Sequence, residues 1–130
     1  MRPVVHVFQI YTMSGDDIVW WHLSSSNGRR LARCALPFTS TAQARASIAA
    51  VVPQLSRATA TVRPTPANRW RWMLALDGSP VVLGSGDQDR RVRCENAWRL
   101  FVAAAPLAVV DPAVHTFRGR DSGRTPQVIA

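Results

Sequence analysis

The sequence predicts an α+β fold made of two tandem units, each with three antiparallel strands followed by one helix. We expect the units to be related by a pseudo-twofold axis, with the sheet packed against the helices. Three observations predict this. Strand-like runs separated by turn dipeptides occur twice, an apolar helical stripe follows each set, and a proline stands at the end of each regular helix, at Pro53 and Pro106.

The predicted domain spans residues 1–106, with repeat 1 at about residues 4–55 and repeat 2 at about residues 57–106. Residues 107–130 are expected to form a C-terminal arm or a disordered tail, although the apolar run 109–114 also suits a short strand. A chain of 130 residues with 47% hydrophobic content is large enough to bury about two-thirds of its unfolded surface in one domain.

The strands of the first unit follow a turn-bounded pattern. Residues 4–13 are rich in β-formers and end at a turn sequence, Ser14-Gly15-Asp16-Asp17. Residues 18–24 alternate, with Val19, Trp21 and Leu23 on one face and Ile18, Trp20 and His22 on the other. An Asn27-Gly28 pair predicts a hairpin turn, so residues 31–35 are expected to return as the third strand.

The helix of the first unit has a start signal at Ser40. The Ser40 side chain can cap the backbone, and Gln43, three residues later, can reach back toward the cap. Residues at helical spacing then form one apolar stripe, which predicts packing against the sheet: Ala44, Ile48, Val51, Val52 and Leu55.

The second unit repeats this order with a more divergent sequence. Residues 58–62, 69–76 and 80–83 are the expected strands, with Asp77-Gly78 as the hairpin turn and Trp70, Trp72, Leu74 and Leu76 on one face. Residues 95–105 are the expected helix. Its apolar face comprises Ala97, Leu100, Phe101 and Ala104.

The first unit resembles the YegP-like family of small bacterial and archaeal proteins of unknown function. The resemblance rests on Phe8, Ile10 and Tyr11, on Trp21-His22-Leu23, on Asn27-Gly28 with Leu31-Ala32, and on the run from Phe38-Thr39-Ser40 through Ala42, Ala44, Ile48 and Val51. Thr41 and Ser47 stand where the family has Lys and Gly. The likeness covers residues 5–52, and residues 58–105 only through Trp70, Trp72, Asp77-Gly78 and the helix position.

This resemblance implies a small α+β fold and no particular reaction. It also implies that two units pair around a pseudo-twofold axis, so the protein is either a monomer with an internal pseudo-dimer or a homodimer.

The net charge is +8, and all sixteen positive residues are arginine. Arginine suits phosphate and carboxylate recognition, because its planar fork can bond two oxygens at once. The codon bias of a GC-rich genome also explains an absence of lysine. The positive field favours anionic partners weakly in either case.

A search for catalytic groups predicts no enzyme, no cofactor and no metal. His6, His22, His115, Cys34 and Cys94 have no short metal-ligand spacing. Cys94 beside Arg93 has the better setting for a reactive thiol, with a small semi-buried core residue as the alternative. The acidic residues lie mainly in turns, and Gly84-Ser85-Gly86 lacks the lysine of a phosphate loop.

The two unpaired cysteines and the absence of a long apolar stretch predict a cytoplasmic protein that does not span a membrane.

Two functional interpretations remain. The first is a protein-interaction module that binds a protein partner through a sheet face and a basic loop at residues 87–93. The second is an auxiliary nucleic-acid-binding protein that uses the arginine-rich loop and tail. The candidate surface comprises Trp20, His22, Arg69, Arg71, Arg90, Arg91, Arg93, Arg118 and Arg120. The simpler alternative is that the loop arginines pair with Asp87 and Asp89.

Overall fold

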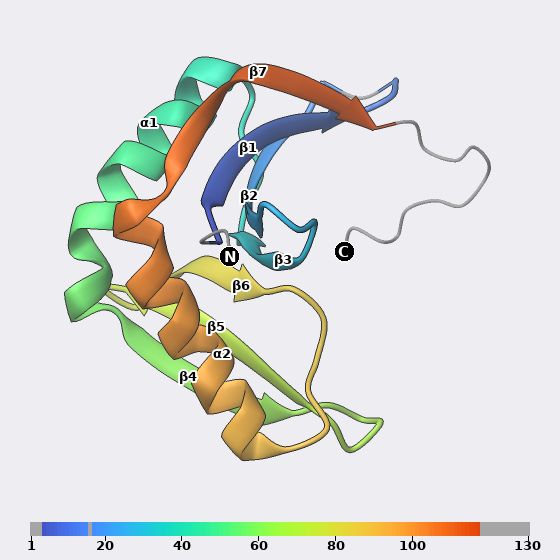
Figure 1. Ribbon diagram of the computed structural model, residues 1–130, viewed down its shortest axis with the longest axis vertical. Helices are drawn as coiled ribbons and strands as arrows, with labels where there is room; N and C mark the ends of the chain where they lie inside the picture. The colour runs from blue at the N-terminus through green and yellow to red at the C-terminus, as the bar shows by residue number, and fades with distance from the viewer. Residues whose placement is uncertain (1–3, 16, 118–130) are drawn as a thin grey trace.

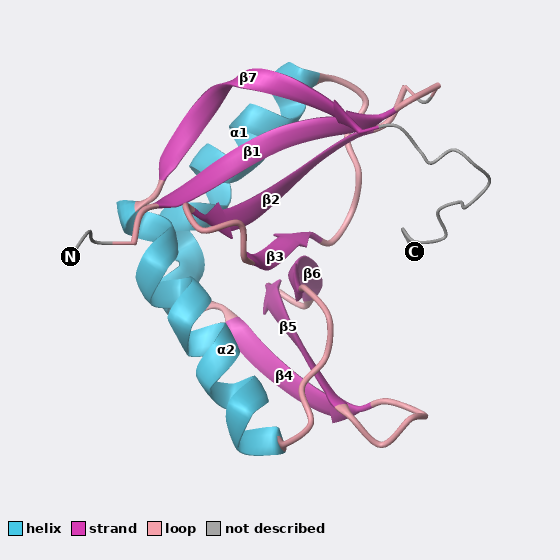
Figure 2. Cartoon of the chain, turned by 45° about the vertical axis from the view of Figure 1, so that its right-hand side comes forward, coloured by secondary structure: helices cyan, strands magenta, loops and turns pink. Residues whose placement is uncertain are grey.

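The fold is a seven-stranded sheet with two helices on one of its faces (Figure 1; Figure 2). The computed structural model describes residues 4–15 and 17–117. The first unit comprises β1 (His6–Met13), β2 (Val19–Ser25), β3 (Arg30–Cys34) and α1 (Thr41–Val51). The second comprises β4 (Thr59–Pro64), β5 (Trp70–Leu76), β6 (Ser79–Gly84) and α2 (Arg91–Ala104), and β7 (Val109–Phe117) follows. The predicted α+β class is confirmed.

The two three-stranded sets meet at the centre of the sheet. The strand order is β4-β5-β6-β3-β2-β1-β7, so the third strand of each set lies beside the third strand of the other. This central contact is antiparallel and short, with Ala32 opposite Gly84, Arg33 opposite Leu83 and Cys34 opposite Val82. One continuous sheet therefore joins both units.

Strand β7 comes from the segment predicted as an arm or tail. It pairs in parallel with β1, from Val109 beside Val7 to Phe117 beside Met13, with a register shift between Phe8 and Ile10. The apolar run that suggested a short strand ends at residue 114. The strand continues through polar residues to Phe117 because the outer edge of β1 offers backbone hydrogen bonds along its length. Arg118 and Arg120 lie outside the described residues.

The predicted cap of α1 forms, with one difference. The backbone N–H of Gln43 donates to Oγ of Ser40 at 3.1 Å. The Gln43 side chain reaches back as expected, but its Oε1 accepts from the backbone N–H of Thr39 at 3.0 Å rather than from that of Ser40. Pro53 lies in the 3-10 helix Val52–Arg57, which ends the regular helix.

Helix α2 starts four residues earlier than predicted. It begins at Arg91, with Arg90 as its N-cap, whereas the sequence suggested a start at residue 95. Arg91 pairs with Glu95, and Arg93 pairs with Asp89, both at a spacing of four residues. Residues 91–93 of the predicted basic loop are therefore the first turn of a helix, because the fully buried Cys94 draws this turn into the core, while residues 87–90 form the loop before it.

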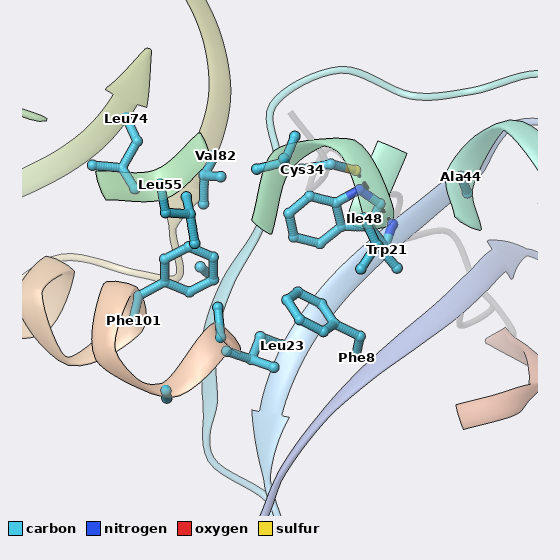
Figure 3. Close-up of a cluster of buried hydrophobic side chains, with 14 of the residues drawn as sticks. Phe8, Trp21, Leu23, Cys34, Ala44, Ile48, Leu55, Leu74, Val82 and Phe101 are labelled. Carbon is cyan, nitrogen blue, oxygen red and sulfur yellow. Dashed lines mark hydrogen bonds between the residues drawn. The ribbon is translucent and has the colours of Figure 1, made fainter. Parts of the chain in front are cut away.

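The core lies between the sheet and the helices (Figure 3). Trp21 meets Phe8 edge to face, with ring centroids 5.4 Å apart. On the other half of the sheet, Trp72 lies 5.7 Å from Phe101 of α2. The predicted core positions of Trp21 and Trp72 are therefore confirmed, since both side chains are buried.

Gly84 lets Trp72 lie flat against β6. A Cβ added at Gly84 would lie only 2.4 Å from Nε1 of Trp72. The φ angle at this position is not in the left-handed region, so the need for glycine comes from the indole and not from the backbone. Since Gly84 also pairs with Ala32, the indole of Trp72 lies against the strand that joins the two halves.

We predict that Gly84→Ala lowers the free energy of unfolding by about 2 kcal/mol, the cost typical of overpacking a core. Urea denaturation measures the change. In a Trp72→Leu background, which removes the indole, the same Gly84→Ala substitution should cost much less. An equal cost in both backgrounds would show that the indole is not the reason for glycine here.

Candidate anion-binding site

The sheet face opposite the helices carries a continuous row of side chains. Directly paired residues point to the same face of a sheet, and the register links Arg33 to Leu83, Leu83 to Met73, and Met73 to Thr61. In the other direction, Arg33 pairs with His22. Because the neighbouring row contains core residues such as Leu74 and Val82, this row lies on the open face.

A hollow of about 830 Å³ lies on this open face, over β3, β4, β5 and β6. Four arginines line it, namely Arg30, Arg33, Arg63 and Arg71. Met73, Leu83 and the largely buried Trp72 contribute its apolar part, and Thr61 and residues 84–86 complete the lining. The volume is in the range of pockets that hold a ligand or an anchoring segment of a partner.

Among the residues that the structure describes, no carboxylate belongs to the lining of this hollow. Arg63 and Arg71 are direct cross-strand partners, so two positive side chains lie opposite each other. Nη2 of Arg71 lies 4.0 Å from Oδ2 of Asp87. The other carboxylate oxygen of Asp87 accepts a hydrogen bond from Nε of Arg69. Among residues 4–15 and 17–117, no carboxylate oxygen lies within 4.0 Å of the guanidinium groups of Arg30 or Arg63.

Arg33, the remaining arginine of the hollow, is held in place by contacts with its own strand β3 and with the indole of Trp20. Nη1 of Arg33 donates to the carbonyl oxygen of Cys34 at 2.9 Å. The Arg33 guanidinium carbon lies 5.0 Å from the ring centroid of Trp20, in a cation–π arrangement. Trp20 is half-buried and packs against the Arg33 guanidinium, so the site extends toward β2.

The structure separates the basic residues that the sequence grouped together. Arg71 lines the hollow, and Arg69 holds Asp87 at its side. Arg91 lies over Trp70 and pairs with Glu95, and Arg93 pairs with Asp89. The simpler alternative was that the loop arginines pair with Asp87 and Asp89. Arg93 does pair with Asp89, whereas Asp87 pairs with Arg69 and Arg71 of the neighbouring segment.

Sequence reasoning missed three of the four arginines in the hollow, Arg30, Arg33 and Arg63. Arg30 and Arg33 belong to a short basic run with Arg29, but this run and Arg63 lie on two strands that are far apart in the chain. The pairing of β3 with β6 brings Arg33 close to the residues of β4 and β5. A signal was present in the alternation of each strand, which puts Arg33 and Arg63 on the face opposite the core residues.

The expectation that His22 is exposed on this face is wrong, since His22 is only 1% exposed. The ring of Phe117, at the end of β7, is nearly parallel to the imidazole at a centroid distance of 6.2 Å, and Tyr11 lies 4.8 Å away. Nε2 of His22 lies 2.8 Å from Oε1 of Gln9. This cluster covers the β1 and β2 part of the face, so the accessible part is the hollow.

Burial shifts the pKa of His22 and of both cysteines. Desolvation, with the nearby positive charge of Arg30 and of His115, lowers the pKa of His22 to about 4. Burial raises the pKa of the Cys34 thiol to about 11, and it also raises the pKa of Cys94. The idea that Cys94 has a lowered pKa is therefore wrong: the thiol is buried in the core, and Glu95 adds a negative charge beside it.

The described residues provide neither a cluster of metal-binding side chains nor a membrane-spanning helix. Across residues 4–15 and 17–117, three or more His, Cys, Asp and Glu side chains do not gather into a group that could hold a metal ion. Neither helix in this part of the chain is long and apolar enough to span a membrane.

The fold has counterparts among solved structures. The solution structure of E. coli YegP, a protein of unknown function, aligns with a TM-score of 0.61 at 16% identity, covering 96% of this chain and 100% of that chain. The chain has the YegP fold. A UPF0339 protein of Shewanella oneidensis aligns with the same TM-score of 0.61 at 10% identity, again over 96% of this chain and 100% of that chain.

The YegP fold confirms the resemblance seen in the first unit and extends it over nearly the whole chain. At these identities the likeness concerns the fold and does not transfer a function. No family model matches the sequence, and no curated protein matches it. The arginine hollow is the feature of this example of the YegP fold that points to a function.

We predict that His22 makes stability depend on pH between about 4 and 6.5. Because the folded pKa is below the unfolded value, the contribution is complete above pH 6.5 and is lost as the pH falls toward 4. Between pH 7.5 and pH 5.0 the free energy of unfolding should fall by about 2 kcal/mol through this residue. Urea denaturation at the two pH values measures it.

His22→Phe should remove this part of the pH dependence, while His6→Gln, at a half-buried position on β1, should retain it. An NMR titration that finds the His22 imidazole protonating near pH 6.5 would contradict the assignment.

Proposed function

We propose that this chain is a non-enzymatic protein-interaction module that binds an acidic segment of a partner protein in the arginine hollow. One observation carries the proposal. Four arginines from three strands line a hollow to which the described part of the chain contributes no carboxylate. Guanidinium groups collected in this way favour an anionic partner, because each can form two parallel hydrogen bonds to a carboxylate.

The arrangement is unfavourable for the protein alone. Like charges placed directly opposite on neighbouring strands destabilise a sheet, and Arg63 and Arg71 are such a pair. Neither Arg30 nor Arg63 gains a compensating carboxylate from the described part of the chain. A bound anion would supply the missing negative charge, which is why we assign these residues to binding rather than to folding.

The composition of the site favours a protein partner over a nucleic acid. Arginine, methionine and tryptophan are enriched at protein interfaces, and the hollow combines arginines with Met73, Leu83 and the nearby Trp20. Single-stranded nucleic acid is usually held by several aromatic side chains on which successive bases stack. On this face Trp20 is half-buried and already stacks with Arg33, and Tyr11 is buried.

Two observations support a non-enzymatic role. Both thiols are buried in the core, and the buried imidazole of His22 is bonded to Gln9, so none of the three is placed to attack a substrate in the hollow. The free state of both cysteines also agrees with a cytoplasmic location, which we include in the proposal.

We further infer that the two units are related by a pseudo-twofold axis at the pair Arg33–Leu83, consistent with a monomer that contains an internal pseudo-dimer. The strand order supports this, because it is β4-β5-β6 on one side and β3-β2-β1 on the other. The turns also correspond, with Asn27-Gly28 in one unit and Asp77-Gly78 in the other. In this relation β4 is the counterpart of β1.

The test is fluorescence anisotropy with a labelled ten-residue peptide that alternates glutamate and valine. We expect it to bind, and the double substitution Arg63→Gln with Arg71→Gln should weaken binding at least tenfold. Arg99→Gln with Arg45→Gln is the matched control. It removes the same charge from the helices that cover the other face.

A labelled oligouridylate of equal charge, measured in parallel, separates the two interpretations. We expect it to bind more weakly than the peptide under the same salt conditions. Tighter binding of the oligouridylate that depends on the same arginines would overturn the proposal in favour of a nucleic-acid partner. Equal loss in the double variant and in its control would show that net charge alone, and not the hollow, attracts the peptide.

A further inference from the structure

The two edges of the sheet are not equivalent. At one edge, β7 pairs with β1 along most of its length. At the other edge, β4 pairs with β5 on its inner side, and no strand of the described part of the chain lies on its outer side. The edge that is left open is the one that borders the arginine hollow, since Thr61 and Arg63 of β4 line it.

The register shows which backbone groups of β4 point outward. The N–H of Thr65 donates to the carbonyl oxygen of Arg69 at 2.7 Å, which marks a hydrogen-bonded pair at the end of the hairpin. Such pairs alternate along an antiparallel ladder, so Arg63 and Thr61 bond toward β5. Ala60 and Val62 therefore direct their N–H and C=O groups away from the sheet.

Pro64 fits the same pattern. It occupies the next outward-facing position, where its missing N–H costs β4 no bond to β5. The open stretch of the edge is consequently centred on Ala60 and Val62. Their side chains are half-buried on the helix side, while Thr61 and Arg63 between them face the hollow.

A strand added beside β4 would have one row of side chains on the hollow side of the sheet and the other row on the helix side. Successive side chains of a strand point to opposite faces, so every second residue of a segment beside β4 would lie on the hollow side. Negative residues at those positions would come close to Arg63 and Arg71, and apolar residues between them would continue the helix-side surface of Ala60 and Val62. The backbone would supply affinity and the alternate side chains specificity.

We propose that the acidic partner segment binds in extended form as an eighth strand along the outer edge of β4. This inference rests on the proposed function, and it names how the partner is held: by backbone hydrogen bonds to Ala60 and Val62 together with carboxylates over the arginine hollow. The pairing of β7 with β1 in the same molecule shows that the corresponding edge of the first unit accepts an additional strand.

The experiment uses the labelled peptide of alternating glutamate and valine in two N-methylated forms. One form is methylated at every glutamate nitrogen and the other at every valine nitrogen. In an added strand the N–H groups of one set face β4, and those of the other set face solvent. We expect one form to lose at least tenfold in affinity and the other to bind within about twofold of the parent peptide.

Two results would overturn strand addition. Either full binding by both forms or an equal loss in both would show that β4 forms no one-sided backbone ladder with the peptide. Binding by the parent peptide that still requires Arg63 and Arg71 would, in either case, leave the proposed function intact. Failure of the parent peptide to bind at all would instead contradict the proposed function itself.

A variant of the protein tests the same point from the other side. Val62→Pro removes an outward N–H that β5 does not use, in the way that Pro64 already does. It should weaken binding of the parent peptide at least tenfold while retaining the wild-type circular dichroism spectrum. Unchanged affinity in a folded Val62→Pro protein would contradict the inference, and if this variant does not fold, the two methylated peptides still decide the question.

Discussion

The antiparallel contact between β3 and β6 is the constraint on which the rest of this molecule depends. It comprises only three residue pairs, yet it joins two sets of three strands into a single sheet. The core face of this contact holds Ala32, Cys34 and Val82, all with 1% exposure or less. The same three pairs put Arg33 and Leu83 opposite each other on the open face, which begins the arginine hollow.

The need for close packing at this contact explains several side-chain choices. Position 84 requires glycine because the indole of Trp72 lies where a Cβ would be. On the neighbouring strand β3, Sγ of Cys34 accepts a hydrogen bond from the backbone N–H of Trp21 at 3.2 Å. Small residues therefore bring the backbones of β3 and β6 together beneath large aromatic rings. The helices then close the core over these rings through residues such as Ile48 and Phe101.

The two halves of the open face differ because β7 is added at one edge only. Beside β1, the rings of Tyr11 and Phe117 bury His22 and keep its imidazole neutral, so that half is closed and structural. Beside β4, four arginines line an open hollow, and within the described residues Arg30 and Arg63 have no carboxylate partner. One edge of the sheet is thus covered by β7, whereas no described strand covers the outer edge of β4, which borders the surface to which we assign function.

Much of the fold could be predicted from the sequence, since alternation identified the strands, Ser40 marked the start of α1, and Trp21 and Trp72 fell on the core face. The start of α2 could not, because arginines precede it and the burial of Cys94 is a tertiary effect. The site was predicted in part. Arg71 follows from the alternation of β5, but Arg30 and Arg33 reach the hollow only through the pairing of β3 with β6, which no local pattern encodes.

The most direct test of the account is to observe the arginine side chains during binding. Two-dimensional NMR of the Nε–Hε groups, with unlabelled peptide of alternating glutamate and valine added stepwise, follows each arginine separately. We predict saturable shifts for Arg33, Arg63 and Arg71, with the signals of Arg45 and Arg99 on the helices unchanged. Shifts that are spread evenly over all arginines, or confined to the helices, would contradict the assignment of the hollow as the binding site.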